Sequence, residues 1–371
     1  MLVRRPSPEH PALDRRTDAA RKGRGAVSNR TGRFETQERI ATADGWDMDP
    51  DADAPRLGTT LVIDAARRIV TFNSSPDIPF DRSINPYKGC EHGCVYCFAR
   101  PTHAWLGLSP GLDFETRLFH KPDAPELLAA ELADPKYRPA TMALGTNTDP
   151  YQPVERETRL TRRILEVLAE HRHPFSIVTK SALVVRDLDI IAPMAAADMA
   201  TVAISVTTLD RDLARRMEPR AATPPRRLEA IRALAAAGVP TAVMAAPMIP
   251  ALNDMELEAI LDAAAAAGAT GAGYVLLRLP LEIRDLFVEW LEAHVPDRAS
   301  RVMRLVRDTR GGRDYSAQWG ARMRGTGPYA ELLRQRFRLA VARLGLNRRR
   351  HDLDVSQFRR PPRAGDQMSL F

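Results

Sequence analysis

Hydrophobic and polar residues follow two alternating periods along the middle of the chain. Short apolar runs typical of buried strands occur at residues 83–89, 140–145, 175–180, 201–208, 240–248 and 272–279. Amphipathic helical stretches separate these runs, at residues 124–133, 156–172, 184–197, 225–238 and 254–268. Six strand–helix units in series predict a parallel sheet covered by helices. Residues 61–72 precede them and have the pattern of two short strands around a turn.

The number of strands limits the architecture. Six strands over roughly 200 residues fall short of the eight in a closed barrel, which leaves an open doubly wound sheet or an incomplete barrel. Both arrangements bind their ligands at the carboxyl ends of the parallel strands. The polar residues that follow each strand are therefore the candidates for chemistry.

The segments that flank this core differ from it in composition. Residues 1–56 are rich in Arg, Asp, Pro and Gly and have no apolar period, so we expect a disordered basic tail. The core then covers residues 57–281, and a helical extension follows over residues 282–346. Residues 347–371 have the composition of a flexible tail.

The net charge of +7 is concentrated at the two ends of the chain. Residues 1–40 contain ten Lys and Arg against five Asp and Glu, and residues 347–371 contain six against three. Such ends either contact nucleic acid through counterion release or are simply solvated. The chain lacks an apolar stretch of membrane-spanning length and the apolar centre of a secretory signal, so we expect a soluble cytoplasmic protein with no membrane partner.

All three cysteines of the chain lie in one short stretch, GCEHGCVYCFAR at residues 89–100. Cys90, Cys94 and Cys97 have the spacing C-x3-C-x2-C, which allows three thiolates on one loop to converge on a single metal centre. Zinc requires a fourth ligand, which His92 in the same loop could supply. A four-iron cluster held by three cysteines would instead leave one iron without a protein ligand.

This motif, with an aromatic residue before its last cysteine and at the end of the first strand of the series, resembles the radical S-adenosylmethionine superfamily. The surrounding stretch SPDIPFDRSINPYKGCEHGCVYCFARPTHAWLGL, residues 75–108, resembles the spore-photoproduct-lyase-like branch. The resemblance extends over residues 60 to 280. It implies a partial (β/α)6 TIM-type barrel, a [4Fe-4S] cluster on the three cysteines, S-adenosyl-L-methionine on the open iron, an electron donor protein, and formation of a 5′-deoxyadenosyl radical.

The resemblance also implies where the cofactor binds. Tyr96 corresponds to an aromatic residue near the adenine, and Lys180 to a lysine that faces the cofactor carboxylate. The loop after the second strand corresponds to the one that binds the methionine amino group. Its glycine would let the cofactor approach the backbone closely, and its hydroxyl, amide and carboxylate groups would accept hydrogen bonds from the ammonium. The cofactor-binding residues implied in this way are Tyr96, Gly145, Thr146, Asn147, Asp149, Lys180 and Ser205. An ordinary β-to-α loop and a surface lysine are the alternative interpretation.

Two departures from the spore lyase bear on the substrate. That enzyme returns a hydrogen atom to its product radical from a fourth cysteine, which this chain lacks, and Phe98 stands where it has a tyrosine. Spore photoproduct is therefore disfavoured, and Tyr151 or Tyr274 are candidates to replace the missing donor. We expect a radical enzyme acting on nucleic acid, in DNA repair or modification. The alternatives are a radical enzyme that acts on RNA, a peptide or a small molecule, or a non-catalytic iron–sulfur factor associated with the DNA sliding clamp.

The sequence ends in QMSLF, residues 367–371. Gln-x-x-Leu-Phe resembles the short peptide by which bacterial replication and repair proteins bind the DNA sliding clamp. Gln367 would form hydrogen bonds at the rim of an apolar groove, and Leu370 and Phe371 would be buried in it, each gaining roughly 1.5–3 kcal/mol. The ordering of a free tail offsets part of this gain.

We predict that a peptide of residues 362–371 binds the sliding clamp with a Kd in the micromolar range, about −8 kcal/mol. Changing Gln367, Leu370 and Phe371 together to alanine should abolish binding, because both the rim hydrogen bonds and the buried side chains are lost. Isothermal titration calorimetry of the two peptides against purified clamp measures the difference. Equal heats from both peptides would contradict the assignment.

Overall fold

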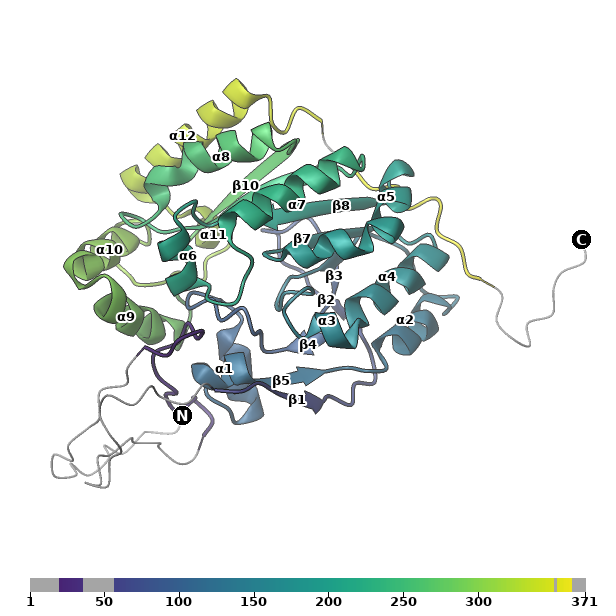
Figure 1. The fold of residues 1–371 in the computed structure, drawn as a ribbon, viewed down its shortest axis with the longest axis horizontal. Helices are drawn as coiled ribbons and strands as arrows, with labels where there is room; N and C mark the ends of the chain where they lie inside the picture. The colour runs from purple at the N-terminus through teal and green to yellow at the C-terminus, as the bar shows by residue number, and fades with distance from the viewer. Residues whose placement is uncertain (1–19, 36–56, 350–351, 362–371) are drawn as a thin grey trace, which may run out of the picture.

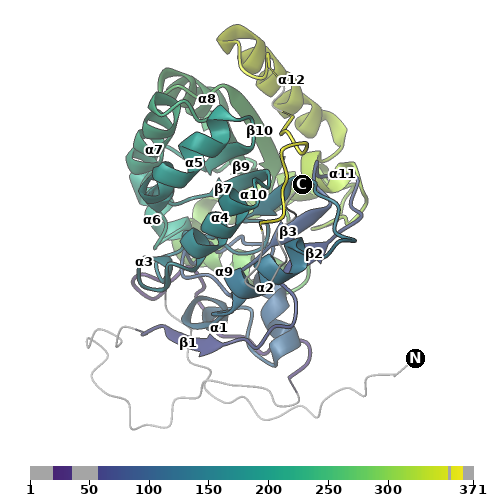
Figure 2. The ribbon, with the colours of Figure 1, turned by 90° about the vertical axis from the view of Figure 1, so that its right-hand side faces the viewer.

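The computed structural model of the protein describes residues 20–35, 57–349 and 352–361 (Figures 1 and 2). Its strands are β1 (Thr60–Ile63), β2 (Val70–Phe72), β3 (Arg82–Ile84), β4 (Tyr87–Lys88), β5 (Arg117–His120), β6 (Met142–Leu144), β7 (Phe175–Thr179), β8 (Ala200–Ser205), β9 (Thr241–Met248) and β10 (Gly271–Leu276). Its α-helices are α1 (Leu112–Thr116), α2 (Ala124–Leu132), α3 (Glu155–Thr158), α4 (Leu160–Glu170), α5 (Leu188–Ala196), α6 (Arg211–Met217), α7 (Pro224–Ala236), α8 (Leu257–Ala266), α9 (Ile283–His294), α10 (Pro296–Asp308), α11 (Ala321–Arg324) and α12 (Gly327–Leu344). Short 3₁₀ helices are η1 (Arg100–Leu106), η2 (Ala182–Asp187) and η3 (Asp254–Glu256).

The main sheet contains the six parallel strands that the sequence predicts. Its order is β10-β9-β8-β7-β6-β3-β2, and β2 is the antiparallel edge strand beside β3. Because the parallel strands follow one another in chain order without a reversal, the sheet curves as an incomplete barrel and is not doubly wound. Helices α5, α7 and α8 pack against it (Figure 2).

The periodicity of the sequence explains why these elements form. In β7 the burial alternates along the strand, with Phe175, Ile177 and Thr179 buried. In α4 the buried residues include Leu160, Ile164 and Leu168, four positions apart, which places them on one face against the sheet. Strand alternation and helical spacing therefore contribute to one apolar core.

The first two strands pair differently from the hairpin that residues 61–72 suggest. β1 and β2 both exist, but β1 pairs in parallel with β5, and β2 pairs with β3. A second, three-stranded sheet of order β1-β5-β4 results, beside the barrel. Local sequence pattern identifies both strands, but it does not reveal that β1 pairs with the distant β5 or that β2 pairs with the strand after it.

Residues 20–35 depart from the disorder expected of residues 1–56. We refer to residues 20–35 as the N-terminal segment; its residues 24–28 are buried. The amides of Gly25 and Ala26 donate to the two carboxylate oxygens of Glu115, at 2.9 and 2.8 Å. The backbone amides of this segment, and not apolar side chains, attach it to Glu115. Its sequence therefore has no apolar period and resembles that of a disordered tail.

The N-terminal segment also reaches the helical extension. Ser28 donates to Glu289 on α9 at 2.6 Å, and Arg33 forms an ion pair with Glu282 at 3.0 Å. It therefore connects the region around α1 to the start and middle of α9.

Residues 352–361 depart in the same way from the flexible tail expected over residues 347–371. The ring of Phe358 lies 5.6 Å from the ring of His173, just before β7. The amide of Asp354 donates to the carbonyl of Asp198, just before β8, at 2.8 Å. This segment therefore crosses the amino ends of two neighbouring barrel strands.

The helical extension predicted over residues 282–346 contains α9 to α12. None of the helices in the described part of the chain is long and apolar enough to cross a membrane. The motif residues Gln367, Leu370 and Phe371 lie outside the described residues, as do residues 1–19 and 36–56.

We predict that Gly25→Ala releases the N-terminal segment. A Cβ at this position would overlap the carbonyl oxygen of Gly93, which is backbone and cannot move aside. Strain of this kind costs about 1–3 kcal/mol. Trypsin should then cleave after Arg24 about 5- to 100-fold faster than in the wild type, since 1.4 kcal/mol changes an opening equilibrium tenfold.

Gly58→Ala is the matched control, because a Cβ at Gly58 meets no atom within 4 Å. Its cleavage rate should equal that of the wild type. If Gly25→Ala is cleaved no faster than Gly58→Ala, Gly25 does not lie against the carbonyl of Gly93.

Candidate active site around the cysteine loop

The cysteine loop, residues 89–100, lies between β4 and η1. Tight turns shape it, because the amide of Gly93 donates to the carbonyl of Cys90 and the amide of Cys97 to the carbonyl of Cys94. Cys90 and Cys94 are buried and Cys97 is half-buried. Burial raises the pKa of all three thiols, so without a metal they are protonated.

This donor set fits an iron–sulfur cluster. Thiolates are the soft ligands that such clusters take, and a bound metal deprotonates a coordinating thiol outright, which offsets its raised pKa. In the described part of the chain, no three His, Cys, Asp or Glu side chains are placed to hold one metal ion. A four-iron cluster spreads its cysteines over separate irons. His92, the possible fourth zinc ligand, lies instead 3.3 Å from Asp149.

A buried ion pair lies directly beneath the loop. The guanidinium of Arg100 donates to the carbonyls of Gly93 and Cys94 at 3.1 and 2.9 Å, and it pairs with Glu115. Both charged side chains are fully buried. The pair therefore fixes the backbone between the first two cysteines, and the same Glu115 carboxylate receives the amides of Gly25 and Ala26 described above.

The loop after β6 contains four of the predicted cofactor residues. Gly145 has φ of 86°, and a Cβ there would overlap the carbonyl oxygen of Val178 on β7, so only glycine fits. The Thr146 hydroxyl and the backbone N–H of Asn147 both donate to the side-chain oxygen of Asn85, at 3.3 and 3.1 Å. This places them beside the end of β3, the strand that leads to the cysteine loop.

Asp149, in the loop after β6, contacts residues from two other segments. Its carboxylate accepts hydrogen bonds from the Thr179 hydroxyl at 2.6 Å and from the Lys180 amide at 2.7 Å, and it also contacts His92. Burial alone would raise the pKa of Asp149, but His92 and these donors outweigh burial and hold the pKa at about 2. Asp149 therefore links the β6 loop, the end of β7 and the cysteine loop, and protein donors already occupy its oxygens.

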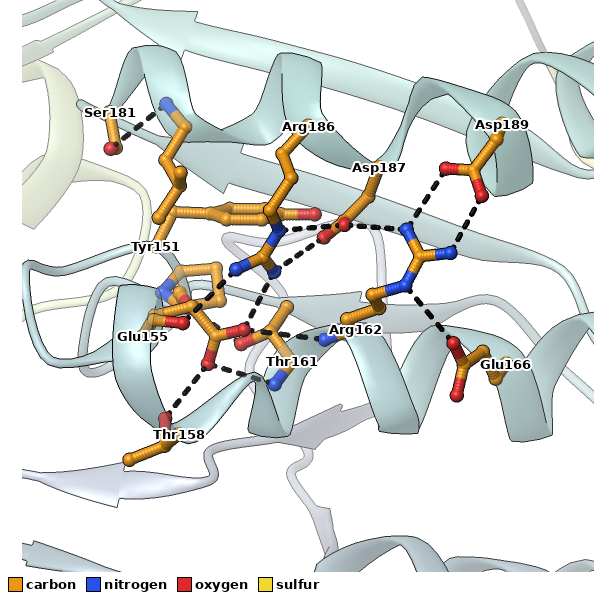
Figure 3. A network of polar contacts seen from close by, with 12 residues as sticks. Tyr151, Glu155, Thr158, Thr161, Arg162, Glu166, Ser181, Arg186, Asp187 and Asp189 are labelled. Carbon is orange, nitrogen blue, oxygen red and sulfur yellow. Dashed lines mark hydrogen bonds and ion pairs between the residues drawn. The ribbon is translucent and has the colours of Figure 1, made fainter.

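A polar network supports these loops from the outer side (Figure 3). Glu155, fully buried, pairs with Arg186 at 2.8 Å, and Arg186 also binds Asp187 at 2.8 Å. Arg162 on α4 bridges Asp187 and Asp189 at 3.1 and 2.6 Å. The segments after β6 and after β7 are thereby fixed to each other.

The remaining predicted residues meet at the ends of β7 and β8. The Lys180 ammonium lies 5.8 Å from the centre of the Tyr96 ring. The Tyr96 hydroxyl donates to buried Glu218, which also pairs with Arg227. Arg227 donates to the carbonyl of Ser205 at 3.0 Å. Tyr96, Lys180 and Ser205 therefore belong to one connected set beside the cysteines.

The two tyrosines considered as hydrogen donors have other surroundings. Tyr274, on β10, packs against Phe337 of α12, with ring centres 4.8 Å apart. Tyr151 is buried, and burial together with the charge of Asp187 raises its pKa well above the usual value. Tyr274 therefore lies against the helical extension, and Tyr151 lies against the network of Figure 3.

Comparison with known proteins identifies the family. Residues 84–264 match the family model of the radical SAM superfamily, where SAM is S-adenosylmethionine. An uncharacterised protein of Mycobacterium tuberculosis is 43% identical over 232 residues, which span 62% of this chain and 68% of that protein. The chain belongs to the radical SAM superfamily. An uncharacterised protein of Methanocaldococcus jannaschii is 28% identical over 173 residues, or 47% of this chain and 62% of that protein.

Solved structures share the fold of this radical SAM protein. A mutant of spore photoproduct lyase aligns with a TM-score of 0.54 at 17% identity, over 77% of this chain and 80% of that chain. The same enzyme complexed with dinucleoside spore photoproduct aligns equally well, at 16% identity. The partial barrel inferred from the resemblance is thus confirmed.

Several residues of the site are not predicted from the sequence. Arg100, Glu115, Glu218 and Arg227 are buried charges, whereas single Arg and Glu residues in a sequence are usually solvated. Arg100 lies three residues after the last cysteine, and this proximity is the one hint that the sequence offers.

We predict that Asp149→Asn lowers the free energy of unfolding of the cluster-free protein by about 2 kcal/mol at neutral pH. The folded-state pKa is depressed from 3.8 to about 2, so the carboxylate stabilises the fold above the unfolded pKa. That stabilisation is lost as the pH falls through the folded pKa. Urea unfolding should therefore show a difference between wild type and variant that shrinks between about pH 4 and about pH 2.

Asp212→Asn provides the control, because this carboxylate is exposed and its partner Arg215 is exposed too. Its effect should be small at every pH. An Asp149→Asn effect that does not change with pH would mean that the ionised carboxylate is not the stabilising group.

Proposed function

We propose that this protein is a radical SAM enzyme that holds a [4Fe-4S] cluster on Cys90, Cys94 and Cys97 and acts on nucleic acid. The observation that carries this proposal is the position of the chain's only three cysteines, two of them buried and one half-buried, on one loop at the carboxyl ends of a partial barrel. Their spacing suits a cluster with one open iron, and they lie within the residues that match the radical SAM superfamily model.

The residues around the loop suit S-adenosylmethionine. When bound to the reduced cluster, this cofactor supplies a 5′-deoxyadenosyl radical that abstracts hydrogen from a substrate. Lys180 offers a positive charge to the cofactor carboxylate. The ring of Tyr96, beside Lys180, provides an apolar surface for the cofactor. Thr146 and Asn147 offer a hydroxyl and an amide oxygen to the amino group. Ser205 completes the set at the end of β8.

Asp149 has a different part in this proposal from the one that the sequence suggested. Since protein donors occupy its oxygens, it positions Lys180 and His92 and does not bind the amino group directly. Arg100 and Glu115 hold the backbone of the cysteine loop in the shape that the cluster requires.

Three features support nucleic acid as the substrate. The fold is that of spore photoproduct lyase, one of whose structures contains a dinucleoside photoproduct. The positive charge of the chain lies at its ends, and residues 367–371 resemble a clamp-binding peptide.

Because the chain has no fourth cysteine, the hydrogen that quenches the product radical comes from a group other than a thiol of this chain.

Anaerobic reconstitution with iron and sulfide tests the proposal. We expect about four irons per chain, and 5′-deoxyadenosine after addition of S-adenosylmethionine and a reductant. DNA should stimulate its formation more than RNA does, if the target is DNA. Liquid chromatography with mass spectrometry measures the product with each nucleic acid.

Two variants separate the parts of the proposal. Cys97→Ser should lose iron and activity together, because a hydroxyl replaces one thiolate. Lys180→Ala should keep its iron but bind S-adenosylmethionine more weakly, by about tenfold for a lost charge-assisted contact. Zinc in place of iron, with no cluster after reconstitution, would contradict the proposal.

A further inference from the structure

An arginine and an exposed aromatic ring lie together on the far side of the cysteine loop from Lys180. Arg278 follows β10, and its guanidinium carbon is 5.1 Å from the centre of the Phe98 ring. Phe98 directly follows Cys97 and is 44% exposed. Tyr96 and Phe98 therefore flank the last cysteine, one beside Lys180 after β7 and the other beside Arg278 after β10. Two strands, β8 and β9, separate these positions in the sheet.

A second arginine lies close to Arg278. Arg310 is 4% exposed and donates to the carbonyls of Leu277 and Ala321, at 2.8 and 2.7 Å. Burial, and next the charge of Arg278, lower the pKa of Arg310 to about 10. The end of β10, near α11, therefore carries two neighbouring positive charges.

Neither of these charges is neutralised within the described residues. Arg278 contacts the Phe98 ring and the Met323 sulfur, and the Nε atoms of Arg278 and Arg310 are both buried without a hydrogen-bond partner. The charge of Arg278 contributes to lowering the pKa of Asp77, but the Asp77 carboxylate already forms an ion pair with Arg322.

Other arginines of the same region are paired. Arg284 and Arg307 share the carboxylate of Asp314, at 3.1 and 2.7 Å. A half-buried guanidinium without a counter-charge is costly, because it has lost water and gained no partner. The contrast indicates that an anion from outside the chain completes the Arg278 site.

We propose that Arg278, backed by Arg310, binds a phosphate group of the substrate at the mouth of the barrel, and that Phe98 packs against the adjoining base or sugar. This inference rests on the proposed function and names the residues that hold its substrate. Arg is the side chain best suited to phosphate, and aromatic rings stack on bases of any sequence. Lys180 and Tyr96 are left for the cofactor, on the other side of Cys97.

The test measures binding of a fluorescein-labelled single-stranded oligodeoxynucleotide to the reconstituted full chain by fluorescence anisotropy. Arg278→Gln should raise the Kd about tenfold or more, and should reduce the slope of log Kd against log salt by about one. Arg304→Gln is the matched control, because Arg304 is an exposed arginine of α10 and this change removes the same charge. It should change the Kd less than about twofold, since exposed single charges contribute little.

Iron content and S-adenosylmethionine binding are measured in both variants. Both should equal those of the wild type, because Arg278 does not touch the cysteines or Lys180. Loss of S-adenosylmethionine binding in Arg278→Gln would overturn the inference, since the arginine would then serve the cofactor. Equal weakening by Arg278→Gln and Arg304→Gln would also overturn it, while oligonucleotide binding by the wild type would leave the proposed function standing.

Competition by a deoxynucleoside monophosphate, a deoxynucleoside and inorganic pyrophosphate distinguishes the source of the phosphate. The monophosphate should compete and the nucleoside should not, because the phosphate carries the contact to Arg278. If the wild type binds the monophosphate directly, dependent on Arg278, but binds no oligonucleotide, the phosphate site stands and the nucleic-acid function fails. If it binds none of the phosphate-bearing ligands, the inference is wrong.

Discussion

The buried ion pair between Arg100 and Glu115 is the interaction on which the cysteine loop depends. Two opposite charges without access to water must satisfy each other and also use their remaining donors and acceptors. Arg100 does so through the carbonyls of the loop, and Glu115 through the amides of the N-terminal segment. The shape of the loop is thus set by charge compensation beneath it, and a change in either partner would leave an unpaired buried charge.

The same arrangement recurs around the mouth of the barrel. Asp149 accepts hydrogen bonds from the end of β7 and contacts His92 of the cysteine loop, and Glu155 pairs with Arg186. Glu218 pairs with Arg227 and receives the Tyr96 hydroxyl. Each of these buried carboxylates links segments that belong to different elements of the chain. Among the described residues, Lys180 and Arg278 have no carboxylate partner of this kind, which is why we propose them as ligand-binding side chains.

The predictable part of the fold is the part that local pattern encodes. The six strands, their helices and the cysteine spacing each occupy a short window, and Gly145 marks a strand end where no side chain fits. The roles of Arg100 and Glu115 depend on backbone groups far away in sequence, which no periodicity reveals. The pairing of β1 with β5 and the burial of Gly25 escape prediction for the same reason.

The segment at residues 352–361 lies at the end of the barrel opposite the cysteine loop. Because this segment is fastened across the amino ends of β7 and β8, the chain after residue 361 starts from the pole opposite the cysteines. A partner bound by the chain beyond residue 361 would therefore be tethered at this pole, and the mouth of the barrel would face away from it. Binding at this pole would set the orientation of the protein relative to its partner.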